Sequence, residues 1–186
     1  MKQTVIVALM LNLGVASVYA QEKPVQMTFS GTAGASAFDL KLPNTRTGEQ
    51  NLTGNGTLGP FTFRLLRATA TSPQPSSTCS ATFIPSVAGG GVLRFQDGSL
   101  LRVNLMPGGG DCIDFVHGVA QCTIPLQITG GTGRFQGASG ALTFTETPLP
   151  AVADASNSPV FFGESGQITG TILGVAVDEE RRDERR

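Results

Sequence analysis

The sequence has no tryptophan, a single histidine and only three cysteines among its 186 residues. Charged residues make up 15% of the chain and the formal net charge is −1, so no basic surface is available to hold nucleic acid. After residue 20, no apolar run approaches the roughly 20 residues that a membrane-spanning helix needs. These shortages argue against nucleic-acid partners and against a membrane span.

Motifs for metal binding and catalysis are also missing. Three scattered cysteines and the lone His117 do not fit the ligand spacings of protein zinc sites. No G-x-S-x-G elbow is present, so we do not expect a serine hydrolase that uses His117. Asp111 and Asp114 lie close together, but their glycine-rich loop lacks the ordered ligand spacing of a known calcium site. We therefore expect no metal, no cofactor and no catalytic residue, and a non-enzymatic role ahead of an enzymatic one.

The two ends of the chain differ from the rest. Lys2 gives a positive start, residues 5–18 are mainly apolar, and Val18-Tyr19-Ala20 provides a cleavage site after Ala20, as in a secretion signal. This pattern predicts a signal peptide over residues 1–20, a single domain over residues 21–177 and a secreted protein, periplasmic or extracellular. The wholly charged residues 178–186 are expected to form a solvated tail, because their opposite charges nearly cancel.

An exported protein can keep disulfides, and Cys79, Cys112 and Cys122 allow one bridge and one leftover thiol. A Cys112–Cys122 bridge would tie the irregular segment Gly108–Gly118 to the strand that follows it. A Cys79–Cys112 bridge would close a longer loop, with a slightly larger entropic effect. We favour Cys112–Cys122, with Cys79 left over, and keep the other pairing as an alternative.

Alternation of apolar and polar residues indicates β-strands along most of the chain. Such stretches lie at residues 25–30, 38–42, 52–65, 92–105, 122–129, 141–147 and 167–177. Residues 106–118 and 148–159 are expected to be loops. With 24 glycines and 11 prolines to form turns, this spacing predicts an all-β antiparallel barrel of about eight strands, with a β-sandwich as the alternative.

The clearest hairpin surrounds Asp97-Gly98, a strong turn signal. Directly paired residues must face the same side of a sheet, so we expect Phe95 to pair with Leu101 across a loop of about three to five residues. This register also places Arg94 opposite Arg102. Like charges in that position repel, and we expect both side chains to splay into water.

The segment 128–140 reads ITGGTGRFQGASG. Its glycine spacing is not G-x-G-x-x-G, strand alternation follows it instead of a helix, and no Lys-Ser or Lys-Thr closes it, so a nucleotide-binding turn is excluded. The glycines instead suit a rigid turn between two strands, because they adopt positive φ without steric cost. Phe135 would plug the space under this turn, while Arg134 points outward. The structural residues of the turn are Gly130, Gly131, Gly133, Phe135, Gly137 and Gly140.

The same run, extended to Phe144, resembles the turn motif of the allene oxide cyclase barrel and the related dirigent proteins. That resemblance implies an eight-stranded antiparallel barrel whose members form oligomers. It carries no catalytic residue across: the plant cyclases use a glutamate near the N-terminal strands, and residues 25–34 contain none.

Together these features predict a secreted barrel that acts as a small-molecule-binding or structural module, with a small apolar ligand as its partner and oligomers allowed. An eight-stranded barrel holds either packed side chains or one small ligand. The alternative is a cofactor-independent isomerase or cyclase that acts on an apolar substrate in the barrel mouth.

Overall fold

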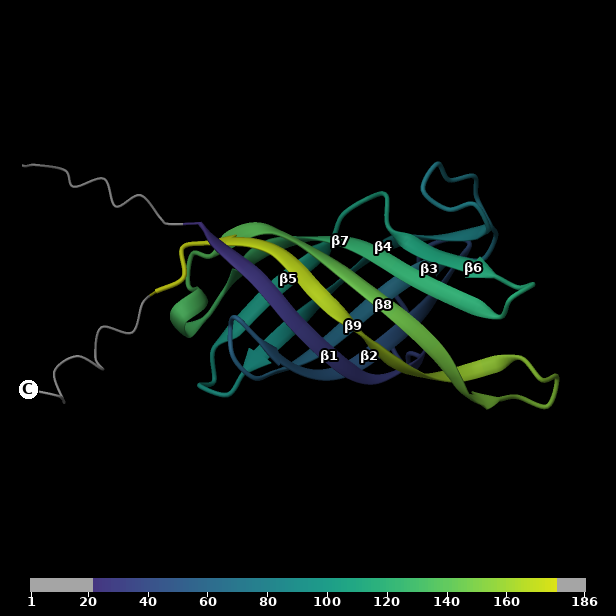
Figure 1. Ribbon diagram of the computed structural model, residues 1–186, viewed down its shortest axis with the longest axis horizontal. Helices are drawn as coiled ribbons and strands as arrows, with labels where there is room; N and C mark the ends of the chain where they lie inside the picture. The colour runs from purple at the N-terminus through teal and green to yellow at the C-terminus, as the bar shows by residue number, and fades with distance from the viewer. Residues whose placement is uncertain (1–21, 177–186) are drawn as a thin grey trace, which may run out of the picture.

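The computed structural model describes residues 22–176, along which nine β-strands follow one another (Figure 1). The strands are β1 (Lys23–Ala35), β2 (Thr45–Gly56), β3 (Phe61–Ala70), β4 (Thr82–Phe95), β5 (Leu100–Leu105), β6 (Gly110–Asp114), β7 (Val119–Gly131), β8 (Ser139–Ala153) and β9 (Pro159–Leu173). A single 3₁₀ turn, η1 (Gly133–Phe135), separates β7 from β8. None of the described residues forms a helix long and apolar enough to cross a membrane.

Every strand pairing is antiparallel, and the pairings close on themselves. β1 pairs with both β2 and β9, and β3 also pairs with β4, so the sheet returns to its own start. The result is a closed antiparallel barrel of eight strands plus one extra strand, which confirms the barrel rather than the sandwich. Within the closed part of the barrel, the described strands have partners on both sides, which removes the edges that another chain could pair with.

The extra strand, β6, lies in a segment that we expected to be a loop. β6 pairs with the first halves of β4 and β7, while β5 pairs with their second halves. β6 therefore continues the line of β5 after the chain loops out at residues 106–109. Its sequence, GDCID, lacks apolar alternation because one inward residue is an aspartate. The alternation pattern therefore did not predict this strand.

Two further expectations about strands were wrong. Residues 38–42 form no strand, because Lys41 and Asn44 adopt left-handed φ values of 54° and 56° that break an extended run. Residues 148–159, expected to be a loop, instead extend β8 and β9 into a long hairpin in which Pro148 pairs with Glu164. A proline tolerates this position because the other edge of β8 has no partner strand there.

The hairpin at Asp97-Gly98 forms, but its register differs by two residues from our expectation. Leu101 pairs with Leu93 instead of Phe95, because a short loop is closed by the bond from the Phe95 amide to the Ser99 carbonyl, 2.9 Å. A two-residue shift keeps every side chain on its expected face. It also removes the like-charge pair, since Arg102 now lies opposite Val92.

The interior is packed with inward-facing apolar side chains over most of its length. Phe144 is fully buried, stacks on Phe29 with ring centroids 4.8 Å apart, and meets Phe63 edge-on at 6.0 Å. Gly166 makes this stack possible, because a Cβ there would lie 2.7 Å from the Phe29 ring. The same core includes Val25, Met27, Leu65, Leu93, Leu101, Ile124, Leu126, Ile168 and Ile172.

The glycine-rich segment closes the end of the barrel at which both described termini lie (Figure 1). Phe135 lies fully buried beneath the turn, with its ring centroid 4.7 Å from that of Phe95. Arg134 stacks over both rings, donates to the Leu58 carbonyl at 2.6 Å and pairs with Asp97 at 3.1 Å. Gly130, Gly133, Gly137 and Gly140 all have positive φ, and Gly131 is the last residue of β7.

We expect Phe135→Ala to lower the free energy of unfolding by about 3–5 kcal/mol, because it opens a cavity in a packed core. The matched control is Phe115→Ala, whose ring is 74% exposed and whose loss should change stability by less than about 0.5 kcal/mol. Urea titration of both variants gives the comparison. Similar stability for the two variants would show that Phe135 is not a structural plug.

Candidate functional site

The inward face of the barrel changes from apolar to polar at the end opposite the glycine-rich turn. On β8, Leu142 and Phe144 are followed by Glu146, and on β3, Leu65 is followed by Arg67, each at the two-residue spacing of one strand face. Seven strands supply one residue each to this layer, which we name the polar ring: Gln50, Arg67, Ser86, Asp111, Cys122, Glu146 and Glu164.

Two buried glutamates and a glutamine form one half of the polar ring. The Gln50 side-chain amide donates to Glu146 Oε1 at 2.6 Å and to Glu164 Oε1 at 3.3 Å. All three side chains are almost inaccessible to solvent. Apart from a proton that the two carboxyls can share, Gln50 Oε1, Glu146 Oε2 and Glu164 Oε2 find no hydrogen-bond donor among the described residues. The half-ring is therefore rich in acceptors and short of donors.

The two glutamates hold a proton between them. Burial, together with the neighbouring Glu146 carboxylate, raises the pKa of Glu164 to about 9. Burial also raises the pKa of Glu146, but Arg67, with Nη2 3.7 Å from Glu146 Oε1, opposes this change. Two adjacent buried carboxyls cannot both ionise without strong repulsion. At neutral pH the pair therefore retains a proton, and Arg67 favours the negative charge on Glu146.

Arg67 organises the other half of the polar ring. Its Nη1 lies 2.9 Å from Asp111 Oδ1, 3.3 Å from Ser86 Oγ and 3.2 Å from Cys122 Sγ. Burial raises the pKa of the Cys122 thiol well above its usual range, so this cysteine is neutral. The Arg67 and Asp111 side chains are 13% and 16% exposed, and the polar ring meets solvent at this pair.

Asp111, Cys122 and Glu146 place potential metal-ligating atoms within 4.8 Å of one another. They come together because they are direct partners across β6, β7 and β8 on the inner face. The Arg67 guanidinium already lies among them, at 2.9 Å from Asp111 and 3.2 Å from Cys122. A fixed positive charge thus occupies the position where a cation would bind, and the trio is better described as the counterions of Arg67.

The expected disulfide between Cys112 and Cys122 was wrong. The structure joins Cys79 to Cys112, with their Cα atoms 5.6 Å apart, and leaves Cys122 as a buried thiol. Cys112 pairs with Gln121 across the hairpin, so the adjacent Cys122 points to the opposite face of the sheet. Two cysteines on opposite faces cannot form a bridge without backbone movement.

The remaining residues considered from sequence are dispersed. His117 is 74% exposed at the tip of the β6–β7 hairpin, where its Nδ1 lies 2.6 Å from Asp114 Oδ2. Asp114 caps that turn, whereas Asp111 faces inward to Arg67. The two aspartates therefore do not share a site. The structural turn at Gly130–Gly140 lies at the other end of the barrel (Figure 1).

The glutamates of the polar ring were missed in the sequence, although a signal was present. Extending the alternation of Leu142 and Phe144 by one step reaches Glu146, and stepping back from Ile168 on β9 reaches Glu164. A charged residue on the core face of a strand is uncommon unless it is paired. These glutamates could be recognised only from their positions along the strands, because they belong to no short sequence motif.

Fold and site together define a closed antiparallel barrel with an apolar core, a plugged end and a buried polar ring at the other end. No protein-family model matches the chain, and no curated protein is detectably similar to it in sequence.

The shared proton predicts how stability depends on pH. An unfolded glutamate releases its proton near pH 4.5, whereas folded Glu164 retains it until about pH 9. Between these values the folded state binds more protons, so the free energy of unfolding should fall as pH rises. Glu164→Gln should flatten this decline in urea titrations at several pH values.

The matched control for this pH series is Glu49→Gln on the outer wall. Its hydrogen bond with Arg64 lowers the pKa of Glu49, so its titration lies below this window. Glu49→Gln should therefore retain the decline. An unchanged slope in Glu164→Gln would mean that the carboxyl pair holds no proton.

Thiol labelling checks the disulfide. In the native protein no cysteine should react with iodoacetamide, because Cys122 is fully buried. After denaturation without reductant, peptide mapping should find the label at Cys122 alone, and after reduction at all three cysteines. Label at Cys79 before reduction would show that Cys79 is the free thiol and that Cys112 pairs with Cys122.

Proposed function

We propose that this protein is exported and binds a small molecule at the polar ring, through the carboxyl pair Glu146 and Glu164. The observation that carries the proposal is the excess of buried acceptor oxygens, because one proton shared by the two carboxyls cannot satisfy Gln50 Oε1, Glu146 Oε2 and Glu164 Oε2 together. Unpartnered buried polar atoms are costly unless a ligand or water satisfies them. Clusters of buried carboxyls with shifted pKa values are also typical of functional sites.

The surroundings of the polar ring indicate the chemistry of the ligand. Acceptor oxygens call for a ligand group with hydroxyl or amine donors. Two hairpins project at this end of the barrel (Figure 1), and their exposed apolar side chains include Phe115 and Val116 on β6–β7 and Leu149 and Phe161 on β8–β9. A ligand with a donor group and an apolar body would match both the acceptor oxygens of the polar ring and the apolar side chains of the two hairpins.

Export is supported by the N-terminal sequence pattern and by the Cys79–Cys112 disulfide, since such bonds persist in oxidising compartments. The predicted signal peptide and charged tail lie outside the described residues. We also propose kinship with the allene oxide cyclase and dirigent barrels, supported by the ITGGTGRFQGASG motif and by the closed barrel.

The carboxyl pair also favours a second candidate, a cofactor-independent isomerase or cyclase. A protonated Glu164 could donate a proton to a substrate while the Glu146 carboxylate removes one, so that no net proton is consumed. Positioned acid–base pairs of this kind accelerate reactions by about 10²–10⁴-fold. Conversion of the bound compound to an isomer, lost in Glu146→Gln, would distinguish this activity from simple binding.

Binding is tested by incubating the purified mature protein with a cell extract, removing unbound compounds by gel filtration and identifying retained ones by mass spectrometry. The wild type should retain a compound, and Glu146→Gln should retain roughly tenfold less, because a charge-assisted hydrogen bond is lost. Glu22→Gln, at an exposed glutamate directly before β1, is the control. No retained compound, or equal retention by Glu146→Gln, would refute the proposal.

A further inference from the structure

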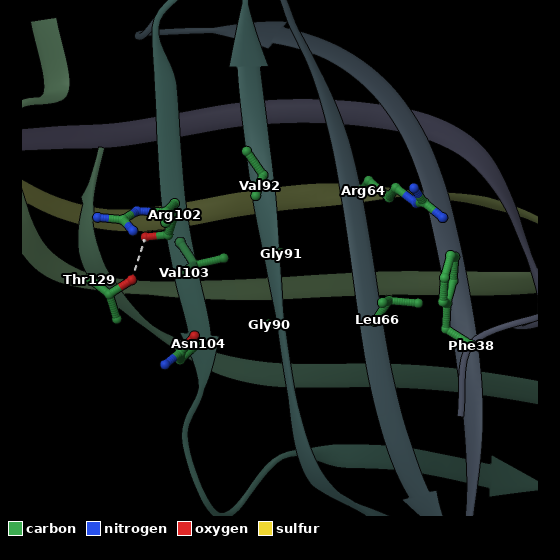
Figure 2. Close-up of a pocket in the computed structure, with 10 residues that line it drawn as sticks. All are labelled: Phe38, Arg64, Leu66, Gly90, Gly91, Val92, Arg102, Val103, Asn104 and Thr129. Carbon is green, nitrogen blue, oxygen red and sulfur yellow. Dashed lines mark hydrogen bonds between the residues drawn. The ribbon is translucent and has the colours of Figure 1, made fainter. Parts of the chain in front are cut away.

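The outer wall of the barrel carries a groove that is separate from the polar ring. It has a volume of about 630 Å³, within the range of small-molecule sites. Figure 2 shows it lying over β4, between side chains of β3 on one side and of β5 on the other. The lining residues that matter are Phe38, Arg64, Leu66, Gly90, Val92 and Arg102.

The groove exists because β4 lacks side chains at its centre. Gly90 lies between Leu66 of β3 and Asn104 of β5 in one cross-strand row. A Cβ at Gly90 would lie 2.9 Å from both Asn104 Oδ1 and the Val103 carbonyl oxygen. β4 has no side chain at Gly90 because the neighbouring atoms leave no room for one, so the side chains of the adjacent strands form the walls of the groove (Figure 2).

The neighbouring cross-strand row places two arginines across the groove. Arg64 pairs with Val92, and Val92 pairs with Arg102, so the arginine Cα atoms are about 10 Å apart at ordinary strand spacing. No acidic residue lines the groove within the described part of the chain. An arginine therefore stands at each side of an apolar floor, and Arg102 is the one whose charge is not paired among the described residues.

The two arginines differ in what they already bind. Arg64 lies 2.6 Å from Glu49 Oε1 and stacks over the Phe38 ring at 5.5 Å, which fixes it as part of the wall. Arg102 is exposed and forms no ion pair with any residue between 22 and 176. Its backbone carbonyl accepts a bond from Thr129 Oγ1 at 3.4 Å, which does not occupy the guanidinium.

We propose that the Arg102 side of this groove is a second binding site, which holds an amphipathic organic anion with its acidic group on the Arg102 guanidinium, directed toward β7 (Figure 2), and its apolar body on Val92 and Leu66. Guanidinium groups bind carboxylates and sulfonates through paired, charge-assisted hydrogen bonds. β3, β4 and β5 each have two neighbouring strands along the groove. Their backbones therefore cannot accept an added strand, and side chains must provide the recognition.

The test compares two fluorescent probes of the same shape. 8-Anilinonaphthalene-1-sulfonate carries an anion, and N-phenyl-1-naphthylamine has the same rings without it. Fluorescence titration should show that the sulfonate binds the wild type more tightly than the neutral probe. Arg102→Gln should weaken the sulfonate about tenfold, the equivalent of one charge-assisted hydrogen bond, and leave the neutral probe unchanged. Arg102→Lys should retain part of the difference.

Three controls keep this result specific. Arg94→Gln removes an exposed arginine from the same outer face but outside the groove, and should change nothing. Val92→Ala shortens the apolar floor directly beside Arg102 and should weaken both probes. Glu164→Gln alters the polar ring and should leave the sulfonate unaffected, so the two proposals can fail separately. The proposal would be overturned if Arg102→Gln and Arg94→Gln weakened sulfonate binding equally. It would also be overturned if only Phe115→Ala, at the mouth of the barrel, weakened sulfonate binding.

Discussion

Closure of the sheet is the constraint on which the rest of this structure depends. Once β1 has paired with β9 and β3 with β4, every second residue of each strand points into a space that only side chains from the same barrel can fill. Packing then becomes collective, because the ring of Phe144 fits only while Gly166 leaves room for Phe29. The burial of these aromatic side chains is the main stabilising contribution that a barrel of this size offers.

The two ends of the barrel satisfy this constraint differently. At one end, backbone bends and a single aromatic side chain, Phe135, fill the opening, and Arg134 fastens the turn to Leu58 and Asp97. At the other end, the interior is filled by charged and amide groups. Buried charges are tolerated when they are paired, and Arg67 with Asp111 and Glu146 provides that pairing. Glu164 avoids the free-energy cost of burying a charge because it remains protonated.

The outer groove lies over a strand, β4, that has two adjacent glycines. Gly91 faces the core, where a Cβ would lie 2.5 Å from the Phe63 ring, and its neighbour Gly90 faces outward. β4 therefore carries no side chain on either face at this point. Arg102 on the adjacent strand β5 then supplies the unpaired charge of the groove, since Arg64 is paired with Glu49. The same strand thus leaves room for a core aromatic ring on one face and forms the floor of the groove on the other.

The sequence by itself determined the class of the fold and the faces of the strands. Alternation at residues 122–129 and 141–147, with glycines between them, was sufficient because side-chain direction in a strand has a period of two residues. Only the tertiary structure decided which strand ends meet. Gln50, Glu146 and Glu164 lie up to 114 residues apart, and Cys112 reaches Cys79 rather than its nearer neighbour because Cys122 faces the other side. Such contacts depend on register and closure, which are set by many weak pairings at once and by no local pattern.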